Sequence, residues 1–209
     1  VCNSPTKYNQ GEPFVYCSNE KTCPPQILGK LQHFISKDAM DIETLGEGKI
    51  ELLFRKGLVI SPADLYDLKY DQLLGLENEY ESSDGKIRKV RFQQKTVENI
   101  LKSIEKSKSK PFDRVLYALG IKNIGSIMAK NIANYAKSLD RLMQMSKEEL
   151  RQIPDVGEIT AQSIIDWFSD ADNLDLIKRL KQVGLKFDIE KETQQSEKLK
   201  GLNFVISGV

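Results

Sequence analysis

The sequence predicts a mainly α-helical fold made of tandem repeats, each with two helices joined by a tight hairpin turn. One phrase recurs: a bulky apolar residue, a glycine, and further apolar residues four and seven positions after the glycine. It occurs at Leu45-Gly46, Ile124-Gly125 and Val156-Gly157, and with glutamine in place of glycine at Phe92-Gln93. Apolar residues at helical spacing after each copy, and an aromatic content of only 8%, favour helices. Four copies in one register indicate tandem helix-hairpin-helix repeats.

The length and charge of the chain set broad limits. With 209 residues, it can form one large or two small domains with a hydrophobic core. Its 31 Lys and Arg nearly balance 30 Asp and Glu, so that binding to nucleic acid would depend on local basic patches. No apolar run approaches the roughly 20 residues of a membrane span, and no signal-peptide pattern is present. We therefore expect no membrane association.

All three cysteines, Cys2, Cys17 and Cys23, lie near the N-terminus. Turn-forming residues and a short β-prone run, 14–16, separate the first two. Two cysteine knuckles beside a small hairpin can bind a tetrahedral Zn²⁺, which is typical of a reducing compartment. The fourth ligand is either a cysteine upstream of Val1 or His33, although the amphipathic run 26–36 favours a surface position for His33. We expect a zinc finger over residues 1–25; the alternative is three unrelated buried thiols.

The repeats are expected to occupy residues 26–187. Pro24-Pro25 favours a helix start, Gly57 the end of the first hairpin's helix, and Ser61-Pro62 the start of a short helix. Ser146 and Glu149 form a capping-box pattern. In the helices after Gly125 and Gly157, Ile127 and Ile159 are expected to pack inward. Other helices are expected at 26–36, around 50–54, and at 92–107, 112–119, 139–145 and 172–183.

The second hairpin is interrupted by a polar insertion, residues 78–90. Without it, the first two copies of the phrase would lie 34 residues apart, close to the spacing of 32 between later copies. We expect a small β-hairpin with Asp84-Gly85 as its turn. Its second arm, which contains Lys86, Arg88 and Lys89, is basic. That arm either lies along a phosphate backbone or is a solvated loop.

The hairpin glycines suggest a binding mode. Each is expected to adopt φ > 0, so that the backbone can reverse sharply between two helices. The turn then presents unpaired N–H groups at a helix N-terminus, where an anion such as phosphate can bind. For a single copy, a glycine that merely ends a helix is the simpler interpretation. Four copies favour binding to a phosphate backbone.

The C-terminal residues differ in composition. Residues 188–200 are rich in Glu, Lys, Gln and Ser and are expected to form a linker. The β-prone residues 201–209 follow. Because one strand cannot fold alone, we expect the chain to continue into another domain.

In this order, the features resemble the C-terminal half of bacterial NAD-dependent DNA ligases: a zinc finger of the four-cysteine type, four helix-hairpin-helix repeats, and the first β-strand of an α/β BRCT domain at 201–209. The match covers nearly the whole chain. It rests on Cys2-Asn3-Ser4, Cys17-Ser18-Asn19, Cys23-Pro24-Pro25-Gln26, His33-Phe34, the run from Asp38 to Gly46, and Ala118-Leu119-Gly120-Ile121.

The resemblance implies the non-catalytic, DNA-binding half of an enzyme that seals nicks in duplex DNA during replication and repair. It implies a fourth zinc-binding cysteine before Val1. The implied cofactors are Zn²⁺ here, and NAD⁺ with Mg²⁺ or Mn²⁺ in the whole enzyme. The implied partners are nicked double-stranded DNA and upstream adenylation and OB domains, in a monomer of the bacterial cytoplasm associated with the nucleoid. The adenylated Lys-x-Asp-Gly motif is absent, because Ser82-Ser83 precedes Asp84-Gly85, so this part should be inactive alone.

The residues expected to contact DNA lie in three hairpins: Thr44, Gly46, Lys49, Lys122, Asn123, Gly125, Lys130, Val156 and Gly157. Hairpins of the family often read Gly-apolar-Gly, and here the first glycine is replaced by Thr44, Arg91, Asn123 or Asp155. Because Asn and Asp tolerate the left-handed conformation, the third and fourth hairpins should keep their geometry. The second hairpin lacks both glycines and is expected to serve packing, and the Asp155 carboxylate should weaken phosphate binding by the fourth.

Two other interpretations remain. The chain is a stand-alone helix-hairpin-helix module of another DNA repair protein, or a zinc-stabilised scaffold for protein interactions whose hairpins serve only packing.

Overall fold

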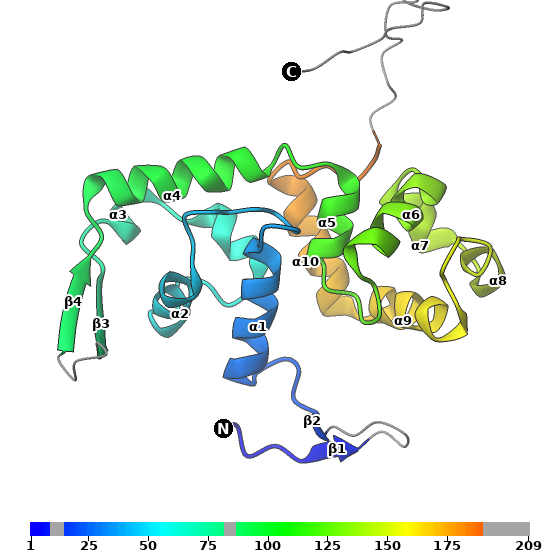
Figure 1. The fold of residues 1–209 in the computed structure, drawn as a ribbon, viewed down its shortest axis with the longest axis horizontal. Helices are drawn as coiled ribbons and strands as arrows, with labels where there is room; N and C mark the ends of the chain where they lie inside the picture. Colours follow the sequence, from blue (N-terminus) through cyan, green and yellow to red (C-terminus); the bar gives the residue numbers. More distant parts are fainter. Residues whose placement is uncertain (9–14, 82–86, 190–209) are drawn as a thin grey trace, which may run out of the picture.

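The computed structural model describes residues 1–8, 15–81 and 87–189, and this part of the chain is mainly helical (Figure 1). The predicted Asp84-Gly85 turn, residues 190–200 of the predicted linker and the predicted strand at 201–209 lie outside the described residues. The strands are β1 Thr6–Tyr8, β2 Val15–Cys17, β3 Glu77–Glu81 and β4 Ile87–Arg91. The helices are α1 Pro24–Ile35, α2 Glu47–Arg55, the 3-10 helix η1 Pro62–Asp67, α3 Tyr70–Leu73, α4 Gln94–Ser107, α5 Phe112–Ala118, α6 Ser126–Ala136, α7 Leu139–Gln144, α8 Lys147–Leu150, α9 Glu158–Ser169 and α10 Ala171–Gln182.

Most predicted helix ends are confirmed. Pro24 and Pro25 occupy the first positions of α1, and Ser146 with Glu149 forms a capping box at α8. Gly57 and Gly184, which follow α2 and α10, have positive φ, where glycine carries no steric cost. The short helix after Ser61 is a 3-10 helix, capped by reciprocal bonds between Ser61 and Asp64.

The four strands form two separate antiparallel pairs. In the first, Thr6 lies opposite Cys17. In the second, Glu77 lies opposite Arg91, which confirms the predicted strands of the insertion. The Phe92 N–H donates to the Leu76 carbonyl oxygen (2.8 Å) and closes the base of this pair, which projects from the body beyond α3 and α4 (Figure 1).

A single cluster of buried apolar side chains connects the repeats. The apolar residue before each hairpin position, Leu45, Phe92, Ile124 or Val156, is buried in it, as predicted. The prediction for Ile127 and Ile159 is wrong, because these side chains are 76% and 74% exposed. Both occupy the first turn of a helix, before the apolar face meets the core.

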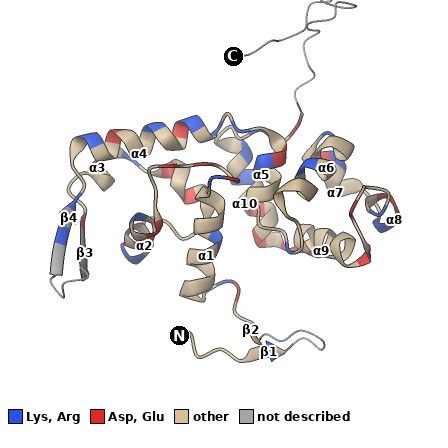
Figure 2. Ribbon diagram, viewed as in Figure 1, with Lys and Arg blue, Asp and Glu red and all other residues tan. Residues whose placement is uncertain are grey.

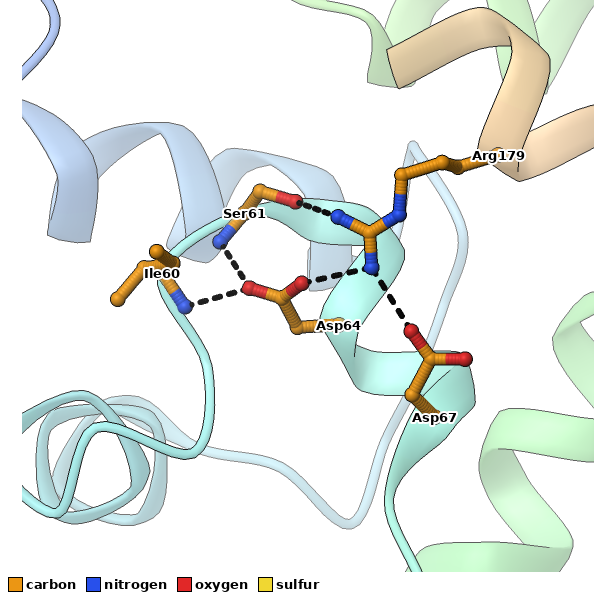
Figure 3. Close-up of polar contacts among 5 residues, drawn as sticks. All are labelled: Ile60, Ser61, Asp64, Asp67 and Arg179. Atoms are coloured by element: carbon orange, nitrogen blue, oxygen red, sulfur yellow. Dashed lines mark hydrogen bonds and ion pairs between the residues drawn. The ribbon is translucent and has the colours of Figure 1, made fainter. Parts of the chain in front are cut away.

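Arg179 on α10 connects two parts of the chain that are distant in sequence (Figure 3). Its guanidinium donates hydrogen bonds to the carboxylates of Asp64 and Asp67 on η1, and both bonds are 2.8 Å long. The other Asp64 oxygen accepts the backbone N–H groups of Ile60 and Ser61. The same carboxylate therefore caps η1 and anchors α10 to it.

Within the described residues, no helix combines the length and hydropathy that crossing a bilayer requires.

Candidate functional site

The four hairpins place the same backbone at the start of their second helix. The N-cap residues Gly46, Gln93, Gly125 and Gly157 have φ between −83° and −88°, with ψ near 180°. The prediction that the hairpin glycines adopt φ > 0 is therefore wrong. This extended conformation is open to any residue, as Gln93 demonstrates.

In the third and fourth hairpins, the residue with the left-handed backbone conformation lies two positions before the hairpin glycine. Asn123 has φ +65° and Asp155 has φ +66°, so the prediction that Asn and Asp preserve the turn is confirmed. Thr44 and Arg91, at the equivalent positions, do not have positive φ.

The space around the three hairpin glycines is open. Apart from the adjacent residues of the chain, no atom of the described residues would lie within 4 Å of a Cβ built on Gly46, Gly125 or Gly157. No side chain caps the N-termini of α2, α6 or α9, where the helix dipole is positive. Neither backbone conformation nor packing within the described residues requires glycine here. What glycine permits is the close approach of an external group to the backbone.

The third and fourth hairpins bind each other through two equivalent hydrogen bonds. Asn123 Nδ2 donates to Ser163 Oγ (3.0 Å), and Asn131 Nδ2 donates to Asp155 Oδ2 (3.3 Å). Asn123 and Asp155 are equivalent positions 32 residues apart, and so are Asn131 and Ser163. Exchanging the hairpins therefore maps one bonded pair of positions onto the other, with donor and acceptor reversed, which is the signature of a local twofold axis.

The first and second hairpins share one contact of this kind. Thr44 Oγ1 donates to the Asn99 carbonyl oxygen (3.4 Å), and these residues lie at the positions equivalent to Asn123 and Ser163. The four repeats thus associate as two pairs, first with second and third with fourth.

The basic residues predicted to contact DNA occupy different surroundings. Lys49 donates to the Thr44 carbonyl oxygen (2.6 Å), within its own hairpin. The Lys122 ammonium lies 5.6 Å from the centre of the Tyr16 ring on β2. Lys130 lies further along α6 and lines a cavity of about 270 Å³ with Phe112 and Asp188. Of these three lysines, Lys49 and Lys122 lie directly at a hairpin.

Acidic residues also lie near the hairpins. The Glu158 carboxylate, in the first turn of α9, pairs with Lys147 (2.5 Å) and Arg151 (3.4 Å), and the Lys147 hydrogen bond lowers the pKa of Glu158. The Asp155 carboxylate accepts from Asn131, so its charge is partly engaged. Val156 is buried, which leaves only its backbone for an external partner. Figure 2 shows Lys and Arg interspersed with Asp and Glu along α4, in keeping with the balanced charge of the chain.

The three cysteines lie together at the N-terminal end of α1, whose N-cap residue is Cys23. Their Sγ atoms are all within 4.8 Å of one another, and Cys2 and Cys17 are 3.4 Å apart. Sulfur ligands at about 2.3 Å from a tetrahedral zinc would be about 3.8 Å apart, so this arrangement fits three of four thiolate ligands. Hydrogen bonds from Ser4 lower the pKa of the Cys2 thiol to about 6, whereas burial raises that of Cys23.

The alternative assignment of His33 as the fourth ligand is contradicted. His33 Nε2 lies 2.7 Å from the Tyr117 carbonyl oxygen on α5, and the two rings meet edge to face at 4.6 Å. His33 is absent from the group of potential metal ligands found among the described residues. It lies on the face of α1 that packs against α5.

The cysteine module, which comprises the described residues 1–8 and 15–23, contacts the third hairpin and the start of α10, the helix that follows the fourth hairpin. Lys21 Nζ lies 2.5 Å from Asp172 and 3.6 Å from Asp170, both at the start of α10. The ammonium group of Lys122, beside the turn of the third hairpin, lies over the ring of Tyr16 on β2. The position of β1 and β2 is thus coupled to that of the third hairpin.

The hairpin geometry is that of helix-hairpin-helix repeats, and the family described as helix-hairpin-helix motif matches residues 114–177 of the chain. The DNA ligase of Cytophaga hutchinsonii is 43% identical over 212 residues, and that of Flavobacterium johnsoniae 41% over 210 residues. Both alignments cover 100% of this chain and 30% of the relative. The DNA ligase of Caldicellulosiruptor saccharolyticus is 41% identical over 186 residues, which cover 89% of this chain and 26% of the relative. The chain is thus similar to part of these DNA ligases, and it spans about 30% of the length of the first two.

Four residues of the paired hairpins were missed as site residues by sequence reasoning: Ile127, Asn131, Ile159 and Ser163. Each has an equivalent 32 residues away, at the same offset from a hairpin glycine. That shared offset was the available signal. It identifies equivalent positions, but which of them face each other depends on the local twofold axis.

Proposed function

We propose that this chain is the duplex-binding, non-catalytic half of an NAD-dependent DNA ligase that seals nicks during replication and repair. The open glycines carry the proposal, because close approach by a phosphate would explain why glycine occupies three N-caps where the fold does not need it. Homology to DNA ligases and the helix-hairpin-helix motif support the same partner.

The local twofold axis of the third and fourth hairpins suits duplex DNA. The two strands of a duplex are antiparallel and are themselves related by twofold axes across the grooves. A symmetric pair of helix N-termini can therefore hold one phosphate on each strand. Such contacts position the protein without reading sequence.

Zinc is the second part of the proposal. Cys2, Cys17 and Cys23 would hold the ion with a fourth cysteine, for which the family resemblance implies a place upstream of Val1. The ion would fix β1, β2 and the start of α1 in a module too small for a core of its own. We also propose that residues 1–25, 26–187, 188–200 and 201–209 correspond to the zinc finger, the hairpin domain, a linker and the start of a BRCT domain.

Chemistry would take place elsewhere in the whole enzyme. NAD⁺ would supply AMP to a lysine of the adenylation domain, with Mg²⁺ or Mn²⁺, and the AMP would pass to the 5′ phosphate at the nick. This part would hold the nicked duplex, as one region of a monomer in the bacterial cytoplasm at the nucleoid.

The test is binding of a labelled nicked duplex across a range of salt concentrations. The logarithm of the binding constant should fall with that of the salt concentration, by roughly 0.9 per phosphate contact. Gly125→Ala should weaken binding and leave helix content and melting temperature unchanged, because the added Cβ would meet no described atom beyond the adjacent residues of the chain. Gln93→Ala is the matched control and should bind normally. A response to salt that is flat would contradict DNA binding and favour a protein-interaction scaffold.

A further inference from the structure

Two exposed isoleucines occupy equivalent places in the paired hairpins. Ile127 and Ile159 each lie two residues after the hairpin glycine, in the first turns of α6 and α9, and are 76% and 74% exposed. The local twofold axis that relates Asn123 to Asp155 also relates these two side chains.

The fold does not require an apolar residue at this position. The equivalent residues of the first and second hairpins are Gly48 and Lys95. Neither isoleucine is among the apolar residues buried in the core or packed against it. Single exposed apolar residues are common on proteins, but two at symmetry-equivalent positions beside open helix N-termini point to a shared partner surface.

The chemistry of the position indicates which part of the partner these residues meet. Lysine or arginine would serve at a phosphate, whereas isoleucine offers no hydrogen bond and no charge. In duplex DNA, the apolar surface next to the phosphates is the C–H surface of the deoxyribose rings that line the minor groove. Apolar side chains are suited to contacts within that groove.

We propose that Ile127 and Ile159 enter the minor groove and pack against the deoxyribose walls of opposite strands, while the adjacent helix N-termini hold phosphates. This inference rests on the proposed function and adds an uncharged contact to it. The contact is independent of base sequence, because every nucleotide presents the same sugar. It also supplies affinity that salt does not screen.

The test compares salt titrations of nicked-duplex binding for the 209-residue chain and its variants. Ile127→Ser and Ile159→Ser should each weaken binding about three- to tenfold, since part of the transfer energy of an isoleucine is lost. The slope of binding against salt should not change, because no phosphate contact is removed. Conversion to leucine at both positions should keep near-normal affinity.

Ile60→Ser is the matched control, because Ile60 is 62% exposed on another part of the molecule. It should bind as the parent does, and all variants should melt at the parent's temperature. The inference is overturned if the variant that carries both Ile127→Ser and Ile159→Ser binds with unchanged affinity, or if its salt slope decreases. Parent protein that binds with no dependence on salt would instead contradict the proposed function itself.

Discussion

Asn123 in the third hairpin donates a hydrogen bond to Ser163 on α9, across the boundary between two repeats. Asn123 also holds the left-handed turn that leads into α6, at φ +65°. One residue thus sets both the shape of its own hairpin and the contact with its partner. Its equivalent, Asp155, does the same from the other side by accepting from Asn131.

Asn123→Ala should destabilise the protein by about 1–2 kcal/mol, because alanine is strained at positive φ and also loses the bond to Ser163. Asn123→Gly loses the same bond but relieves the strain, and should cost within about 0.5 kcal/mol. The free energy of unfolding in urea distinguishes them. Equal losses in the two variants would show that the hydrogen bond, not the turn, determines stability.

Features that depend on neighbouring residues were predicted well from the sequence. Proline at a helix start, glycine after a helix end and serine at an N-cap act through backbone geometry within a few positions. The recurring phrase likewise located all four hairpins. The 3-10 form of η1 was not predicted, because Ser61-Pro62 marks the start of a helix but does not determine its type.

Features that depend on distant residues were not predicted. Helical periodicity assigned Ile127 and Ile159 to the core, although the first turn of each helix extends beyond it. Assigning φ > 0 to Gly125 and Gly157 as well as to Asn123 and Asp155 was wrong for the glycines, because only the residue two positions earlier is left-handed. The Arg179–Asp64 contact joins residues 115 positions apart, and no local pattern marks it.

Arg179→Leu should lower the free energy of unfolding by about 1–2 kcal/mol, allowing for partial exposure of the ion pairs. Asp64 lies mostly buried and would lose its main charge partner while still capping η1. Lys178→Leu, exposed one residue earlier on α10, is the matched control and should change stability by less than about 0.5 kcal/mol. If both variants unfold at the parent's urea midpoint, α10 is held to η1 by apolar packing alone.

Acid should weaken the fold partly through Asp41. Its hydrogen bond from Lys110 (2.6 Å), and then the charges of Arg114 and Lys106, hold the pKa of Asp41 below its usual value. A lowered pKa in the folded state adds stability that is fully present above the unfolded pKa of about 3.9 and is lost as the pH falls through the folded value.

Asp41→Asn should therefore reduce stability at pH 7 and flatten the decline of unfolding free energy below about pH 5. Asparagine is suited to the positive φ of this position (+54°), so backbone strain does not complicate the comparison. Lys110→Met should produce the same flattening by removing the partner. Parallel pH profiles for the parent and both variants would remove Asp41 from the account of acid unfolding.

The cysteine module should depend on metal while the hairpin domain does not. Cys23 precedes the first residue of α1, and the Gln26 side chain donates to the Cys17 carbonyl oxygen (2.8 Å), so loss of the ion should loosen β1, β2 and the first turn of α1. The larger core from Leu31 onward involves none of the three cysteines.

Chelation should thus leave most of the helical signal in circular dichroism, and should remove the protection of residues 15–26 from hydrogen exchange. Zinc analysis of the protein should give one ion per chain, reduced by Cys17→Ser and unchanged by His33→Ala, because the His33 ring faces Tyr117. A Cys17→Ser variant that retains its full zinc content would overturn the metal assignment.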